Sequence, residues 1–164
     1  MDKVHLEKVT WDTVDDILKL HVNKEQNGFV AKNSDSIIDA YFATVEENCK
    51  VYPFGIYLGK KPVGFIMIAT NVPWAEQYYK LKNEYYYIWR FMIDKKYQGN
   101  GYGKEAMKQA IDFIKTYPSG KTDYCWLSYE PENEVARKLY LSLGFEERLD
   151  LYEEGMEIPA MLKL

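Results

Sequence analysis

The chain has 164 residues, a formal net charge of −4 and a high number of tyrosines, 15 in all. Its length predicts one domain, residues 1–164, with a core that is stable without disulfides or a structural metal. The negative charge argues against a nucleic-acid partner, because phosphate backbones require basic surfaces, and it is compatible with a cationic ligand.

The first half of the chain changes from a strand to helices and back to strands. Alternating polar and apolar residues predict strands, and apolar residues three or four positions apart predict helices. The expected elements, in order, are a strand (4–9), a capped helix (10–21), a loop or broken helix (23–33), a helix (34–49) and a hairpin (53–58 and 62–69).

The second half begins with a polar and aromatic excursion, residues 71–82. The elements expected after it are a buried strand (85–93), a helix (101–115), a strand (124–129), a helix (133–143) and two strands (145–152 and 156–164). Gly144 directly follows the last helix, as a left-handed cap residue does. The order βααβββαβαββ predicts an α+β or mixed α/β domain.

The segment from Phe91 to Lys104 is the most informative part of the chain. An apolar strand ends at Ile93, a loop with three glycines follows at residues 98–103, and a helical pattern begins at once. The first N–H groups of a helix lack intrahelical partners and lie at the positive end of its dipole. Several donors would therefore converge on one place, which suits a phosphate, and Lys104 adds a cation beside it.

The glycine loop fits two common nucleotide-binding motifs poorly. No Gly-Lys-Ser/Thr follows at the spacing of a P-loop, and the glycines lie too late in the chain for a dinucleotide fingerprint. A tight turn without a ligand is the remaining alternative. Against it, a glycine in the first helical turn costs roughly 1 kcal/mol relative to alanine, and such a cost is more readily tolerated where the backbone approaches a ligand.

Two motifs together resemble the GCN5-related N-acetyltransferase (GNAT) family. Residues 98–103 (Gln-Gly-Asn-Gly-Tyr-Gly) match its phosphate-loop pattern Gln/Arg-x-x-Gly-x-Gly/Ala. Residues 133–140 match Asn-x-x-Ala-x-x-Leu-Tyr and are followed by Gly144-Phe145. The resemblance covers the whole chain. It implies a central twisted mixed sheet of about seven strands with four helices, and a V-shaped split between strands 4 and 5.

By this resemblance, acetyl-coenzyme A binds in the split as cosubstrate and no metal is needed. Phe91, Met92 and Ile93 would lie along the pantetheine arm. The pyrophosphate would be held by the amides of Gln98, Gly99, Asn100, Gly101, Tyr102, Gly103 and Lys104. Asn133 would contact the cosubstrate or cap the following helix, and it could do both.

The resemblance also implies that Tyr140 is the general acid that protonates the departing thiolate, since a phenol pKa near 10 suits that transfer. A packed aromatic on an amphipathic helix is the alternative. Many relatives place a glutamate on the strand before the loop, but residues 86–90 contain no carboxylate. The general base is therefore unassigned. Glu84, Glu130 and His21 are candidates, and the helical pattern favours core packing for His21.

The sequence says less about the acceptor amine. Acidic residues recur in the last third of the chain, at Glu130, Glu132, Asp150, Glu153, Glu154 and Glu157. Aromatic residues available as walls are Tyr78, Tyr79, Tyr85, Tyr86, Tyr87 and Trp89. Acidic and aromatic groups together suit a polycation, although a solvated acidic surface is the alternative. We expect Glu84, Trp89 and Glu130 to contact the substrate.

Three segments, residues 26–30, 89–94 and 128–133, are similar to the bacterial spermine/spermidine acetyltransferase branch of the family. This similarity implies an N-acetyltransferase that acts on a small polyamine. Two alternatives stay open: acetylation of another amine, such as an aminoglycoside or a protein N-terminus, and a non-catalytic acetyl-CoA sensor.

Further expectations concern the cellular location of the protein, the state of its cysteines and its partners. No signal peptide or long apolar run is present, so we expect a cytoplasmic protein without a membrane partner. Cys49 and Cys125 lie far apart without metal-ligand spacing, which favours two free thiols of unassigned role over a disulfide. A small-molecule amine is the expected partner, and a homodimer is a further expectation that the sequence does not settle.

Overall fold

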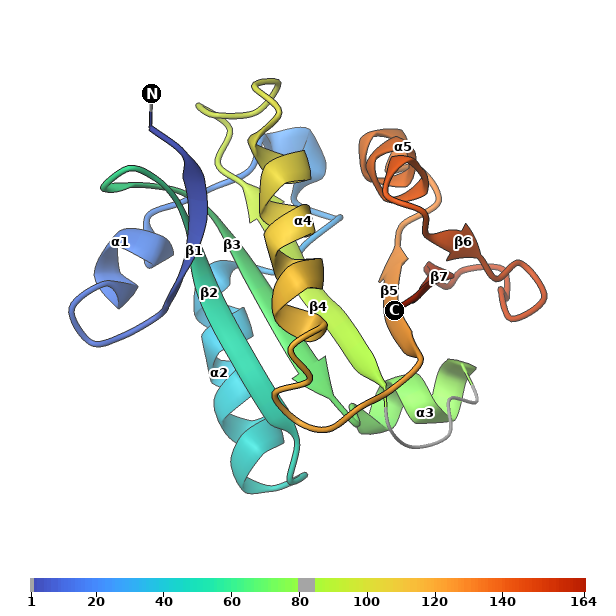
Figure 1. The fold of residues 1–164 in the computed structure, drawn as a ribbon. Helices are drawn as coiled ribbons and strands as arrows, with labels where there is room; N and C mark the ends of the chain where they lie inside the picture. Colours follow the sequence, from blue (N-terminus) through green and yellow to red (C-terminus); the bar gives the residue numbers. More distant parts are fainter. Residues whose placement is uncertain (1, 80–84) are drawn as a thin grey trace.

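The structure is a computed structural model that describes residues 2–79 and 85–164. Within these residues, seven strands form one mixed sheet in the order β1-β2-β3-β4-β5-β7-β6 (Figure 1). The strands are β1 (Val4–Lys8), β2 (Lys50–Leu58), β3 (Lys61–Thr70), β4 (Tyr86–Ile93), β5 (Tyr124–Tyr129), β6 (Glu146–Glu147) and β7 (Ile158–Lys163). The predicted mixed α/β class with a seven-stranded sheet is confirmed.

Among the described residues, the four predicted helices are present, together with one α-helix that the sequence did not predict and a short 3₁₀ helix in the segment expected as loop or broken helix. The helices are α1 (Val14–Leu18), the 3₁₀ helix η1 (Lys24–Gln26), α2 (Asn33–Val45), α3 (Pro73–Tyr79), α4 (Tyr102–Ile114) and α5 (Glu134–Ser142). The prediction of an irregular excursion over residues 71–82 is wrong where α3 forms. Pro73 at its first position is a helix-start signal, because proline lacks the N–H that would be unpaired there.

The C-terminal strands are shorter than predicted. β6 pairs with β7 at only two positions, Glu146 with Met161 and Glu147 with Ala160. After Arg148, whose N–H donates to the carbonyl of Pro159 at 2.8 Å, the chain turns away from the sheet. Leu149, the next apolar residue, is exposed, so no alternating apolar face keeps this segment in the sheet.

The sheet opens between β4 and β5. These strands are parallel and pair only at Tyr86 with Cys125 and Tyr87 with Trp126. Beyond Tyr87 the two strands diverge, so that the second half of β4 has no β5 partner. On its other side β4 pairs with β3 throughout, except that Trp89 is an extra residue between two register positions. Such a bulge bends a strand, and the predicted V-shaped split is confirmed.

Each face of the sheet is covered by helices (Figure 1). On one face, Ile88 packs in the cluster that contains Met107 and Ile111 of α4. On the other face, Met92 packs with Ile17 of α1 and Ala40 of α2. The side chains of β4 thus reach both layers of the core. The strand is therefore fixed firmly, although one of its edges is open.

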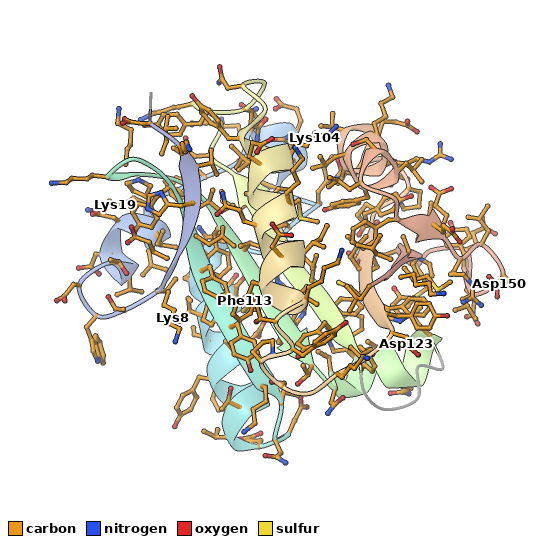
Figure 2. All side chains as sticks on the ribbon, in the orientation of Figure 1. Lys8, Lys19, Lys104, Phe113, Asp123 and Asp150 are labelled. Carbon is orange, nitrogen blue, oxygen red and sulfur yellow. The ribbon has the colours of Figure 1, made fainter. Side chains whose placement is uncertain are left out.

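Helix α4 lies along the sheet and brings its first turn to the open edge of β4 (Figure 2). At its far end, the Phe113 ring contacts Tyr52 and Phe54 of β2 edge-on, with ring centroids 5.3 and 5.0 Å apart. Ala106, Met107, Ala110, Ile111 and Ile114 form its buried face. This packing fixes the direction of the helix and hence the place to which its N-terminus points.

Candidate active site

A cavity of ≈ 630 Å³ lies where β4 and β5 separate. Its wall combines the open half of β4 with the end of β5, the glycine loop, α5 and the α1–α2 connection. Residues that contribute to it include 26–31, Trp74, 87–93, 97–99, 101–103, Ser128, Tyr129, Asn133, Leu139, Tyr140 and Glu157. Most of the residues predicted for the site are therefore gathered at one cavity.

The glycine loop presents unpaired backbone donors to this cavity. Gly99 and Gly101 have φ values of +78° and +80°, a conformation that side-chain-bearing residues rarely adopt. Gly101 caps α4, and the N–H groups of Gly101, Tyr102 and Gly103 donate to no other described residue. Three free donors at the positive end of a thirteen-residue helix have the geometry and the electrostatics that suit an anion.

Gly103 has a different function in the loop. A Cβ atom placed there would lie 3.3 Å from the Phe91 ring, 3.6 Å from Ile93 and 3.9 Å from Leu139. Glycine at this position lets the first turn of α4 approach both β4 and α5 closely. The three glycines therefore serve backbone conformation at two positions and close packing at the third.

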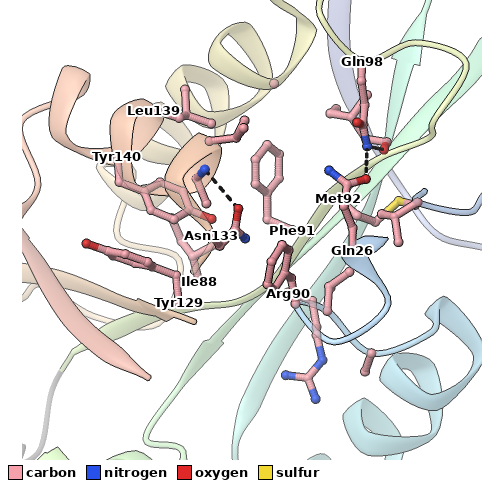
Figure 3. A pocket seen from close by; sticks show the side chains of 18 of the residues that line it. Gln26, Ile88, Arg90, Phe91, Met92, Gln98, Tyr129, Asn133, Leu139 and Tyr140 are labelled. Carbon is pink, nitrogen blue, oxygen red and sulfur yellow. Dashed lines mark hydrogen bonds between the residues drawn. The ribbon is translucent and has the colours of Figure 1, made fainter. Parts of the chain in front are cut away.

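Gln98 ties the loop to its surroundings through its side chain (Figure 3). Its Nε2 donates to Gln26 Oε1 at 2.9 Å and to the Ile93 carbonyl at 3.0 Å, while its Oε1 accepts from Asn23 Nδ2 at 3.3 Å. The side chain of Gln98 therefore connects the end of β4 with the α1–α2 connection. This link fixes the position of the loop.

Asn100 and Lys104, both predicted to contact the cosubstrate, are not part of the cavity wall. The side chain of Asn100 donates to the carbonyls of Tyr97 and Gln98 at 3.0 and 3.1 Å, which closes the loop on itself. The N–H of Lys104 donates to the Gly101 carbonyl at 3.1 Å, and its exposed side chain lies at the start of α4 (Figure 2). Lys104 therefore adds charge near the loop rather than a free amide.

Helix α5 brings Asn133 and Tyr140 to the other side of the split (Figure 3). Asn133 caps the helix, because its Oδ1 accepts from the Ala136 N–H at 3.2 Å, and it also lines the cavity. Gly144 has φ +92°, and the Phe145 N–H donates to the Tyr140 carbonyl at 3.1 Å. The predicted cap of Asn133 and the predicted glycine end of the helix are both confirmed.

The hydroxyl of Tyr140 has no hydrogen bond to another described residue, although the side chain is only 7% exposed. Its ring packs against Tyr129 and Phe145, with centroids 5.6 and 5.9 Å away. Burial, with smaller contributions from the charge of Glu157 and from Tyr129, raises the pKa of Tyr140 well above that of a free phenol. The group therefore keeps its proton at neutral pH and has it available for a ligand.

A hydrogen-bonded group that the sequence did not single out lies at the end of β5. The hydroxyls of Tyr87 and Ser128 are 2.5 Å apart, and Ser128 donates to Glu157 Oε2. All three residues line the cavity. Glu157 stands among several acidic residues before β7, and the sequence offered no signal to select it, since only the β5–β7 pairing brings it to Ser128.

Arg90 brings a cation to the same region. Its guanidinium pairs with Asp39 of α2 at 3.1 Å and lies 5.1 Å from the Trp89 ring centre. Its Nε is buried and has no hydrogen-bond partner among the described residues. Burial lowers the pKa of Arg90, while Asp39, Glu157 and Tyr87 oppose the shift. Arg90 is thus paired with Asp39, and Glu157 is the carboxylate that lines the cavity among the described residues.

The residues predicted to contact or deprotonate the acceptor amine do not all line the cavity. Trp89 lines the cavity. Glu130 is outside its wall, and burial, followed by the charges of Glu157 and Glu132, raises the pKa of Glu130. Glu84 lies outside the described residues. The expected core packing of His21 is wrong: α1 ends at Leu18, and His21 is exposed with its N–H bound by Asp94 Oδ2 at 2.8 Å.

Both cysteines are buried thiols that are not joined in a disulfide, as expected. The Sγ of Cys49 donates to the Asn71 carbonyl at 3.2 Å, and burial raises the pKa of the Cys125 thiol. Among residues 2–79 and 85–164, no group of three or more His, Cys, Asp or Glu is arranged to hold a metal ion. In the same part of the chain, none of the helices combines the length and apolarity that a membrane crossing requires.

The chain matches a known protein family and two named relatives. Residues 14–145 match the acetyltransferase (GNAT) family. A probable spermine N(1)-acetyltransferase from Bacillus subtilis subsp. natto is 31% identical, and the spermine/spermidine N(1)-acetyltransferase of Bacillus subtilis strain 168 is 30% identical. Each alignment covers 94% of this chain and 95% of the relative. Both matches therefore extend over nearly the whole chain.

The fold is similar to that of a PaiA N-acetyltransferase from Thermoplasma acidophilum, whose structure was solved in complex with coenzyme A. The TM-score is 0.68 with 12% sequence identity, over 99% of both chains. At this identity the likeness shows the fold alone.

Proposed function

Because this chain belongs to the acetyltransferase (GNAT) family, we propose that it transfers an acetyl group from acetyl-coenzyme A directly to a primary amine of a small polycation such as spermine or spermidine. Its family and its two named relatives make it an acetyl-CoA-dependent acyltransferase. The proposal concerns the acceptor and the residues that act on it.

The free amides of Gly101, Tyr102 and Gly103 support a pyrophosphate site at the start of α4. From this loop the open edge of β4 leads toward Tyr140 and offers backbone groups that no β5 residue pairs with. An extended pantetheine arm along Phe91 to Ile93 would satisfy them, since unpaired edge groups bind extended ligands well. The side-chain amide of Asn133 faces the same gap (Figure 3).

Tyr140 is proposed as the general acid. Its hydroxyl stays protonated, lies in the cavity wall and has no competing partner among the described residues. As the C–S bond of the thioester breaks, negative charge develops on sulfur, and a positioned hydroxyl can donate its proton there.

The observation that carries the acceptor proposal is the composition of the cavity wall outside the glycine loop. This part of the wall combines aromatic rings from Phe29, Trp74, Tyr87 and Trp89 with the carboxylate of Glu157. Glu130 adds negative charge nearby, because its pKa is raised by burial and then by the charges of Glu157 and Glu132. Aromatic faces and carboxylates both attract ammonium groups. The names of the two Bacillus relatives agree with a polyamine.

Thiol release from acetyl-CoA tests the acceptor. The purified protein is mixed with acetyl-CoA and, separately, with spermine, spermidine, a diamine, a simple monoamine, an aminoglycoside and a peptide with a free N-terminus. We expect the highest kcat/KM with spermine or spermidine. Release with another amine but with no polyamine, at concentrations above about 1 mM, would contradict the polyamine proposal.

A further inference from the structure

We infer that Glu157 is the catalytic base that removes a proton from the acceptor amine, and that Ser128 and Tyr87 position its carboxylate. The inference rests on the proposed function, since it assigns a residue to the acceptor side of the same cavity. It supplies the group that the sequence could not identify, because β4 carries Arg90 and no carboxylate in the stretch that precedes the loop.

The hydrogen-bond directions fix one oxygen of Glu157 and leave the other available. Ser128 has one hydroxyl hydrogen, which it donates to Glu157 Oε2. Its oxygen must therefore accept the hydrogen of Tyr87 across the 2.5 Å contact. Glu157 Oε1 has no hydrogen bond to another described residue and belongs to a side chain that lines the cavity. An ammonium group in the cavity can pair with this oxygen.

The positions and partners of the other carboxylates make them less suited than Glu157 to act as the base. Asp39 is paired with Arg90, and Glu130 is not part of the cavity wall. The charge of Glu157 acts on ionisable groups of several neighbouring segments: Tyr79 on α3, Tyr87 and Arg90 on β4, Glu130 after β5, and Tyr140 on α5. Tyr140 and Glu157 both line this cavity, so the acid and the base face the same space.

The protons of the step balance with Glu157 as the base for the amine and Tyr140 as the proton donor to sulfur. The acceptor enters as an ammonium ion and gives one proton to Glu157. The nitrogen lone pair forms the N–C bond to the acetyl carbon, and the electron pair of the C–S bond leaves on sulfur. Tyr140 gives its proton to sulfur and regains one from the nitrogen. Glu157 passes its proton to water, so the products are one amide, one thiol and one proton.

The substitution Glu157→Gln tests this assignment, because glutamine still accepts a hydrogen bond from Ser128 but is not basic. The acceptor is whichever primary amine of the panel the wild type acetylates fastest, so the test does not depend on that amine being a polyamine. We expect kcat near neutral pH to fall by about 10²–10⁴-fold, with an unchanged Tm. The matched control is Glu154→Gln in the exposed turn before β7, which should keep full activity.

The pH profile separates a base from a structural residue. Raising the pH toward the pKa of the amine should restore the activity of Glu157→Gln by about tenfold per pH unit, because the solution then supplies neutral amine. The wild type should change less over the same range. Parallel profiles, a change confined to KM, or full activity of the variant would overturn the assignment and leave the proposed function intact.

Ser128→Ala tests the positioning of the carboxylate. We expect kcat to fall by about 10–100-fold, as for the loss of one hydrogen bond to a charged group, with recovery in Ser128→Thr. Activity of Ser128→Ala equal to the wild type would contradict the positioning role. A wild type that acetylates no amine of the panel would contradict both the proposed function and the assignment of Glu157.

Discussion

At the scale of single residues, Tyr140 and Glu157 line one cavity but are held in different ways. Tyr140 is fixed by ring packing against Tyr129 and Phe145, and its hydroxyl is left for a ligand. Glu157 is fixed by a hydrogen bond from Ser128 to one of its oxygens. Substituting either polar group by an isostere should therefore change chemistry more than stability.

Tyr140→Phe is predicted to lower turnover by about 10²–10⁴-fold, because it removes the proton donor for sulfur. The ring and its packing remain, so the Kd of coenzyme A and the Tm should stay close to those of the wild type. Steady-state thiol release and calorimetric titration with coenzyme A measure the two effects. Tyr124→Phe, at the half-exposed start of β5, is the control. Unchanged turnover in Tyr140→Phe would remove this residue from the mechanism.

At the scale of elements, the start of α4 combines two requirements in one short loop. Its free N–H groups need the positive φ of Gly101, and its contact with β4 needs the missing side chain of Gly103. The first requirement concerns the direction of the donors, and the second concerns the distance between helix and strand. Both are met only because α4 is held along the sheet by its buried face.

Gly101→Ala is predicted to raise the Kd of coenzyme A by about tenfold or more. A left-handed conformation costs a residue with a Cβ atom about 1–2 kcal/mol, and relief of this strain turns the N–H groups away from the ligand. Isothermal titration calorimetry measures the effect. Gly120→Ala is the matched control, since Gly120 also has positive φ (+106°) with open space around it but is not part of the cavity wall. Equal affinities in the two variants would mean that the loop is only a turn.

At the scale of the whole molecule, the sheet consists of two parts joined by a short parallel contact. β1 to β4 are paired along their lengths, as are β5 and β7, but β4 and β5 share only two residue pairs. A ligand that extends from the glycine loop to Tyr140 contacts both parts. Binding should therefore stabilise the folded protein as one unit.

Coenzyme A at 100 times its Kd is predicted to raise the Tm by about 5–10 °C. Such saturation stabilises a protein by about 2.7 kcal/mol, and each kcal/mol shifts the Tm of a chain of this size by about 2–4 °C. Thermal denaturation followed by circular dichroism measures the shift. Pantetheine, which lacks the nucleotide and pyrophosphate, should give a smaller shift at the same concentration. Equal shifts would show that the anion site does not contribute to binding.

Much of this arrangement could be predicted from local sequence. The hydrophobic periods predicted the seven strands and four of the helices, and the spacing of glycines 99, 101 and 103 predicted the donor loop. Asn133 and Gly144 marked the two ends of α5. These features depend on backbone conformation and on contacts between near neighbours in the chain, which a single sequence displays directly.

The local sequence was not sufficient to identify the proposed general base. Glu157 stands among several acidic residues, and nothing within a few positions distinguishes it. Tyr87, Ser128 and Glu157 belong to β4, β5 and the start of β7, and they meet because the sheet places β5 between the other two.

By itself, then, the sequence determined the family resemblance, the glycine loop and the place of Tyr140 on α5, and the resemblance in turn implied the opening between two strands. Only the tertiary structure decided which carboxylate faces the cavity and which loop residues turn away from it. The reason is physical: helix caps and glycine turns are set by bonds within a few residues, whereas the neighbours of a side chain across a sheet depend on strand order and register.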